Sequence, residues 1–227
     1  MKLIGIVGGG SLGAAIASAL IKFSGIQKQN IKISTGGSNK SRATLLDRGL
    51  LDNFCTNEEI FESSDMIILT VKPSDFSSLN YKLLNKSILI SFVAGLTHES
   101  LRNSFKSDKV FRGMISAPKS IDTASAILCI DGDNKLIRSY FSYFTVKYYV
   151  INELGMSFAT MFVALPSIIS VLTPDEILRL KKDFLTYRNV SRGDNIPLNE
   201  IFDWAVSITP KFKSLSDAKR YVSSMRS

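Results

Sequence analysis

Three glycines, Gly8, Gly10 and Gly13, stand between an apolar run at residues 3–7 and a second run of small and apolar residues at 14–20. The spacing G-x-G-x-x-G between a buried strand and a helix predicts a tight strand-to-helix turn. The first glycine permits the turn, the second lets the backbone approach a ligand, and the third lets the helix pack closely on the strand. Backbone N–H groups and the positive end of the helix dipole then favour an anion such as a pyrophosphate. The alternative is a glycine-rich turn that binds nothing.

The loop after the second predicted strand, residues 31–34, bears on the identity of such a dinucleotide. In NAD sites an acidic residue about twenty positions beyond the glycines binds the ribose 2′-hydroxyl. Here residues 35–42 offer hydroxyls, an amide and the cations Lys40 and Arg42, and no carboxylate precedes Asp47. A carboxylate would repel a 2′-phosphate, whereas these groups would bind and neutralise it. The loop therefore predicts NADP rather than NAD, the alternative being an ordinary solvated loop.

Apolar runs alternate with helical patterns through the first two thirds of the chain. Runs that are apolar on both faces are typical of a parallel sheet covered by helices. Such strands are expected at 65–71, 87–93, 109–114 and 126–130, with a helix at 43–49. The pattern predicts an α/β chain: a Rossmann-type doubly wound parallel sheet at 1–150, followed by a smaller all-helical domain at 151–227.

The C-terminal part begins with a stretch free of charged residues at 154–172. Its length would suffice for a transmembrane helix, but it contains several hydroxyl residues and Pro166. A buried helix at a subunit interface explains the same apolarity and predicts a homodimer. Further helices are expected at 174–187, 198–208 and 215–225.

The composition limits which partners and which cellular compartment are expected for this protein. The formal net charge of +8 suits an anionic ligand, but the basic residues form no long cationic run, which argues against nucleic acid. Cys55 and Cys129 lack metal or redox spacing and are expected to be free thiols in a cytoplasmic protein. The glycines at 8–10 interrupt any signal-peptide core, so neither export nor membrane insertion is expected.

The chain has a single histidine, His98, which excludes a metal site built from several histidines. The surrounding residues 97–100 are typical of the first turn of a helix. His98 is therefore expected to be a solvated, structural residue.

Four segments, taken in order, resemble pyrroline-5-carboxylate reductase. Residues 6–13 resemble that family's phosphate turn, and Thr56-Asn57 precedes a helix where the family has a cofactor-contacting asparagine. The strand ending in V-K-P at 71–73 and the strand ending in A-G at 94–95 match as well. The resemblance covers about the first half of the chain, and it is far more specific than the glycines alone.

The resemblance implies an NADPH-dependent reductase that transfers hydride to a small cyclic imine, as in proline biosynthesis. An F420-dependent NADP reductase and a non-catalytic NADP-binding sensor or assembly protein are the alternatives. The segments that follow the strands would hold the dinucleotide, with 70–73 and 93–95 flanking the nicotinamide. No catalytic residue or metal ligand is predicted. The candidate cofactor-binding residues are Gly8, Gly10, Ser11, Leu12, Gly13, Ser34, Thr35, Ser38, Asn39, Lys40, Asn57, Thr70, Val71, Lys72, Pro73, Val93, Ala94 and Gly95.

The sequence departs from the family at two places. Residues 112–118 keep the arginine, the methionine and the last proline of the family's R-x-M-P-N-T-P pattern, but not its first proline or its asparagine. Residues 162–167 read F-V-A-L-P-S where the family has S-G-S-G-P-A. Losing hydroxyls and adding bulk would remove donors to a substrate carboxylate and fill its space. The departures predict a substrate site that differs from the family's.

Overall fold

The computed structural model describes residues 2–151, 156, 169 and 172–187. The chain divides into two compact units, Met1–Met156 and Ser157–Ser227. The boundary at residue 150 stays a prediction. In the second unit the structure describes one helix, α9 (Pro174–Tyr187), which was predicted with these bounds.

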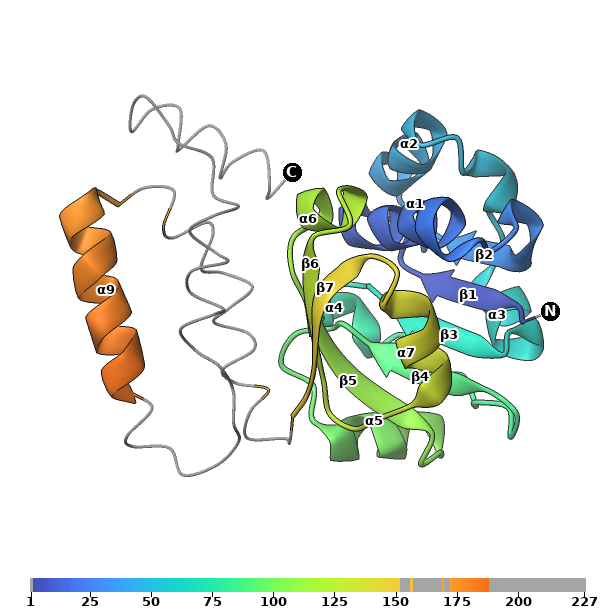
Figure 1. The fold of residues 1–227 in the computed structure, drawn as a ribbon. Helices are drawn as coiled ribbons and strands as arrows, with labels where there is room; N and C mark the ends of the chain where they lie inside the picture. The colour runs from blue at the N-terminus through green and yellow to red at the C-terminus, as the bar shows by residue number, and fades with distance from the viewer. Residues whose placement is uncertain (1, 152–155, 157–168, 170–171, 188–227) are drawn as a thin grey trace. The chain divides into compact units, whose positions relative to one another are not determined.

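A seven-stranded sheet forms the centre of the first unit, in the order β2-β1-β3-β4-β5-β6-β7 (Figure 1). Neighbouring strands are parallel except β5 and β6, which are antiparallel. A parallel crossover needs about a dozen residues or more, and only residues 116–125 connect these two strands. The strands are β1 Ile4–Val7, β2 Ile31–Ser34, β3 Met66–Leu69, β4 Ile88–Ser91, β5 Val110–Ile115, β6 Ala126–Ile130 and β7 Thr145–Val150.

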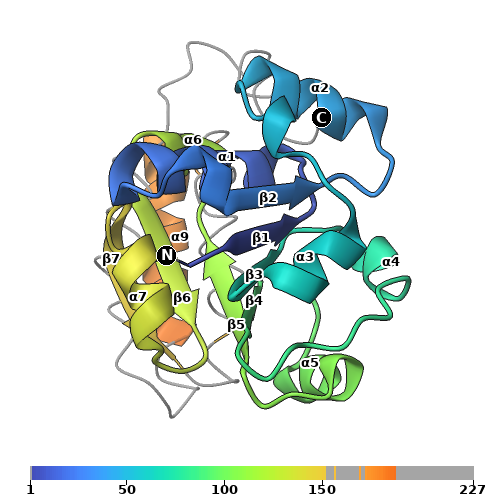
Figure 2. The same ribbon diagram turned by 90° about the vertical axis from the view of Figure 1, so that its right-hand side faces the viewer.

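Helices cover both faces of this sheet. In Figure 2, α1, α6 and α7 lie on one face, and α3, α4 and α5 lie on the other. Short 3₁₀ turns, Lys28–Asn30 and Leu51–Asn53, flank β2 and α2. The helices are α1 Ser11–Ser24, α2 Asn39–Asp47, α3 Asn57–Ser63, α4 Pro73–Phe76, α5 His98–Phe105, α6 Pro118–Asp122 and α7 Lys135–Phe141.

The central strands contribute side chains to two hydrophobic clusters, one on each face of the sheet. In β3, Met66 and Ile68 join the cluster beside α1, whereas Ile67 and Leu69 join the cluster beside α3 and α5. This alternation follows from the two-residue period of a strand. It explains why the buried strands have continuous apolar sequences, and it confirms the predicted α/β class.

Two features of the sheet were not predicted. β7 was missed, and β6 runs against its neighbour β5 instead of along it. The expected helices at 198–208 and 215–225, and nearly all of the uncharged stretch at 154–172, lie outside the described residues. Among the residues that the structure does describe, no helix is long and apolar enough to cross a membrane.

Candidate functional site

The turn between β1 and α1 can only be made with glycine at its first position. Gly8 has a φ of +112°, and a Cβ there would lie 2.8 Å from the carbonyl carbon of Thr70. The N–H groups of Gly8 and Gly9 donate to the carbonyl oxygen of Ser34, at 3.1 and 2.7 Å. The turn is therefore held between β2 on one side and the end of β3 on the other.

The third glycine of the motif fits closely against the first. A Cβ on Gly13 would lie 2.0 Å from the carbonyl oxygen of Gly8 and 2.6 Å from Oγ1 of Thr70. The Thr70 hydroxyl donates to that same carbonyl oxygen at 2.7 Å. This contact brings the first turn of α1 against the end of β1, as the motif requires.

The middle glycine faces open space instead. Gly10 is the N-cap of α1 without a side-chain cap, and a Cβ on it would meet only Oγ of Ser41, at 3.9 Å. The first N–H groups of a helix lack intrahelical partners, and those of Ser11 and Leu12 belong to this turn. The first turn of α1 carries no acidic side chain. The open space above Gly10, here called the cradle, is what the close approach of a pyrophosphate requires, and Ser41, which the sequence alone did not single out, borders it.

The β2–α2 loop combines a buried start with an exposed end. Ser34 and Thr35 are buried, and the hydroxyl of Thr35 has no hydrogen-bond partner in the described part of the chain. Ser38 caps α2 by accepting the N–H of Ser41 at 3.2 Å. Asn39 and Lys40 are exposed at the start of this helix. The loop thus presents an amide and a cation to solvent beside the glycine turn.

The second cation of this loop has an aromatic partner. The guanidinium of Arg42 lies 4.6 Å from the centre of the Phe54 ring. Together with Ala43, Leu46 and Leu51 they line a shallow cavity of about 350 Å³. Lys40 is therefore the better candidate of the two for a phosphate contact.

The remaining candidate residues follow β2, β3 and β4, whose parallel pairing brings their carboxyl ends to one edge. Asn57 begins α3 and accepts a hydrogen bond from the hydroxyl of Ser34. Lys72 is exposed and Pro73 begins α4. After β4, Val93 is buried, whereas Ala94 and Gly95 are exposed, as are parts of Thr70 and Val71. Binding by these residues stays a prediction.

A histidine–carboxylate pair lies beside this same edge. Nδ1 of His98, at the start of α5, is 2.7 Å from Oδ2 of Asp131. Oδ1 of Asp131 accepts the backbone N–H of Arg112 at 2.5 Å. Burial raises the pKa of the Asp131 carboxyl, while these hydrogen bonds oppose that rise. His98 does begin a helix, as expected, and its partly exposed ring is bound to a buried carboxylate.

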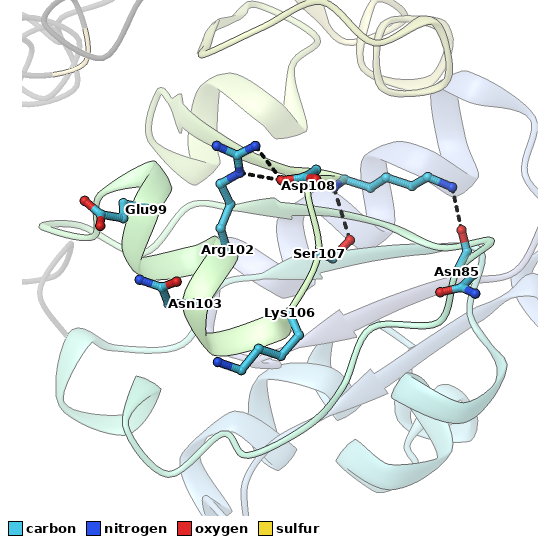
Figure 3. Close-up of a pocket in the computed structure, with 8 residues that line it drawn as sticks. Asn85, Glu99, Arg102, Asn103, Lys106, Ser107 and Asp108 are labelled. Carbon is cyan, nitrogen blue, oxygen red and sulfur yellow. Dashed lines mark hydrogen bonds and ion pairs between the residues drawn. The ribbon is translucent and has the colours of Figure 1, made fainter.

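A polar cavity of about 610 Å³ lies elsewhere on the first unit (Figure 3). Its residues include Asn85 before β4, and Arg102 and Lys106 from the end of α5 and the segment after it. Arg102 pairs with Asp108, and Nζ of Lys109 donates to the carbonyl oxygen of Asn85. These residues precede their strands, so the cavity is at the amino-terminal edge of the sheet. Ligands of open α/β sheets bind at the other edge.

The thiols and acidic residues offer no metal centre in the described part. Cys55 is half-buried and Cys129 is buried, and both are free. Burial raises the pKa of both thiols, that of Cys129 to about 12. Within the described ranges, no three His, Cys, Asp or Glu residues gather as metal ligands would.

The fold and the glycine turn define a Rossmann-type dinucleotide-binding domain. Residues 3–95 match the family model described as NADP oxidoreductase, coenzyme F420-dependent. The chain is 27% identical over 131 residues to the pyrroline-5-carboxylate reductase of Arabidopsis thaliana. The matched region covers 56% of this chain and 47% of that protein. It is 33% identical over 109 residues to pyrroline-5-carboxylate reductase 2 of Bacillus subtilis, covering 46% and 39%.

Among solved structures, the Plasmodium falciparum pyrroline carboxylate reductase with NADP bound superposes with a TM-score of 0.60 at 17% identity, covering 97% of this chain and 84% of that one. The fold of this chain is therefore that of these reductases. The N-terminal part is similar in sequence to these pyrroline-5-carboxylate reductases. The matched region spans less than half the length of the curated relatives.

Proposed function

We propose that this chain binds NADP(H) and transfers hydride from it to a small cyclic imine of the pyrroline-5-carboxylate class. The observation that carries the proposal is the glycine turn, in which Gly8 and Gly13 close against Thr70 while Gly10 leaves open space at the start of α1. Related reductases and the matched family model bear names that agree with this chemistry.

In this arrangement the chain orients the cofactor and the cofactor supplies the hydride. The first turn of α1 would bind the pyrophosphate through its N–H groups and the dipole of the helix. Asn39 and Lys40 would contact the 2′-phosphate, because a cation and an amide donor favour that anion. The backbone at 93–95, with Gly95 at a φ of +78°, would flank the nicotinamide.

The test has a binding arm and a turnover arm. NADPH and NADH are titrated by fluorescence, and oxidation of bound NADPH is then followed with pyrroline-5-carboxylate. We expect tighter binding of NADPH and turnover that prefers it. Equal binding of the two cofactors would contradict the assignment of the β2–α2 loop. Binding of NADPH without turnover of any cyclic imine would refute the reductase activity.

A second candidate is hydride transfer between NADP and the deazaflavin F420. It is favoured by the family model that matches residues 3–95, whose description names this coenzyme. The same preparation distinguishes the two, because reduction of F420 by NADPH removes the visible absorbance of the deazaflavin. A protein that binds NADPH and turns over neither acceptor would instead be the non-catalytic sensor or assembly protein.

We also infer that the chain acts as a homodimer through residues 151–227. The stretch at 154–172 has no charged residue, and such a surface left exposed on a monomer promotes aggregation. The mass in solution is then twice the 25.1 kDa of one chain. A monomeric mass at micromolar concentration would contradict the inference.

A further inference from the structure

The His98–Asp131 pair joins three segments of the first unit that are far apart in sequence. His98 begins α5, Arg112 is in β5, and Asp131 directly follows β6. Arg112 pairs with Ser91, the last residue of β4, so this residue of β5 lies at the carboxyl end of β4. The N–H of Asp131 donates to the carbonyl oxygen of Arg112 at 3.0 Å, so the carboxylate is fixed by the sheet itself.

This position is at the edge where a nicotinamide is expected. The segment that leads from β4 to α5 contains Val93, Ala94 and Gly95, and His98 follows three residues later. Ligands of a doubly wound sheet bind outside the carboxyl ends of its strands. His98 therefore belongs to the same β4–α5 connection as the backbone proposed to flank the reacting ring.

The two members of the pair differ in exposure. The Asp131 side chain is 3% exposed, whereas that of His98 is 29% exposed. A buried carboxylate bound to Nδ1 fixes the orientation and tautomer of an imidazole. With Nδ1 held in this way, Nε2 is the ring nitrogen through which a proton would be transferred.

We propose that His98, held by Asp131, donates the proton that the imine nitrogen takes up during reduction. The proposal rests on the proposed reductase function. Hydride from the cofactor forms the new C–H bond, and the electron pair of the C=N π bond moves to nitrogen. Nitrogen takes the proton from Nε2 of the imidazolium, which becomes neutral and is reprotonated by water. The products are the amine and NADP⁺, so atoms and charge balance.

Asp131 would act through His98, as a positioning residue. Both of its carboxylate oxygens accept hydrogen bonds, one from His98 and one from the N–H of Arg112. Replacing the carboxylate with an amide would keep the volume but would remove the carboxylate acceptor that fixes the imidazole.

The experiment compares His98→Ala, His98→Asn and Asp131→Asn with the control Glu99→Gln, the exposed carboxyl next in sequence. NADPH titration of every variant reports whether the fold and the cofactor site are intact. We expect unchanged NADPH binding, with kcat for pyrroline-5-carboxylate lowered about 100-fold in both His98 variants and about tenfold in Asp131→Asn. Added imidazole should restore part of the kcat of His98→Ala. A purely structural role would not give this rescue.

A second readout needs no substrate. Because His98 is the only histidine, ¹⁵N spectra of an untagged chain contain a single imidazole, whose Nδ1–H form should be lost in Asp131→Asn. Two results would overturn proton donation by His98 while leaving the reductase function standing. One is a folded His98→Ala variant with the kcat of the wild type, and the other is a loss of kcat in that variant that imidazole does not restore. Wild-type protein that binds NADPH and reduces no cyclic imine would overturn the reductase function as well.

Discussion

Gly13 faces the carbonyl oxygen of Gly8 so closely that a Cβ on Gly13 would lie 2.0 Å from that oxygen. The backbone atom cannot move aside without opening the turn between β1 and α1. At Gly10, two residues after Gly8, the same added atom would find only the Ser41 hydroxyl, 3.9 Å away. The two positions therefore separate the cost of breaking the turn from the cost of filling the cradle.

We expect Gly13→Ala to lower the free energy of unfolding by about 3 kcal/mol, since overpacking against backbone is poorly relieved. NADPH binding should weaken at least about tenfold. Gly10→Ala should cost at most about 1 kcal/mol of stability, as a change at an N-cap, yet weaken NADPH binding as strongly. Urea unfolding and fluorescence titration measure the two quantities. Equal losses of stability in both variants would contradict this account.

Lys40 should decide the preference for the phosphorylated cofactor. It is exposed at the start of α2, whereas Arg42 lies on Phe54. Lys40→Ala should weaken NADPH binding about tenfold, or about 1.4 kcal/mol, and leave NADH binding unchanged, because only NADPH carries the 2′-phosphate. Lys82→Ala, at an exposed lysine before β4, is the matched control. A similar loss for NADH would mean that Lys40 does not contact the 2′-phosphate.

The ion pair between Arg48 and Asp122 should contribute measurably to stability. It is bidentate, with N–O distances of 2.7 and 2.9 Å, and both side chains are partly shielded from water, 26% and 37% exposed. Asp122→Asn should lower the free energy of unfolding by about 1 kcal/mol. Asp108→Asn, which removes the more exposed partner of Arg102, should change it by less than about 0.5 kcal/mol. The reverse order in chemical unfolding would contradict the role of burial.

The sequence predicted those elements whose residues carry a local signal. β3 and β4 are apolar on both faces because helices cover both, and the glycines mark the one turn that requires them. β7 gave no such signal, since it is an edge strand whose exposed residues include Val146 and Val150. The antiparallel direction of β6 depends on the short connection after β5, and the hydrophobic periodicity of a strand does not indicate its direction.

The residues of the candidate site likewise divide into those with a local sequence signal and those without one. Ser34, Thr70 and the glycines could be predicted because each lies within a motif or at a strand end. His98 and Asp131 are 33 residues apart, and neither belongs to a motif. Their contact depends on the pairing of β4, β5 and β6, so only the folded chain brings them together. Within the loop at 35–42, Ser41 was not singled out for a related reason, because its position over Gly10 depends on how α2 packs beside α1.

The two cysteines should differ sharply in reactivity. The thiolate is the reactive form, so a raised pKa keeps a thiol protonated and slow at neutral pH. Burial raises the pKa of Cys129 to about 12, and it also raises that of the half-buried Cys55. We expect an alkylating reagent at pH 8 to modify Cys55 slowly and Cys129 only in molecules that have unfolded. The rate at Cys55 should increase with pH, because the thiolate fraction grows as pH approaches the raised pKa. Mass spectrometry of the labelled peptides with and without urea measures both rates, and rapid labelling of Cys129 in the folded chain would show that β6 does not shield it.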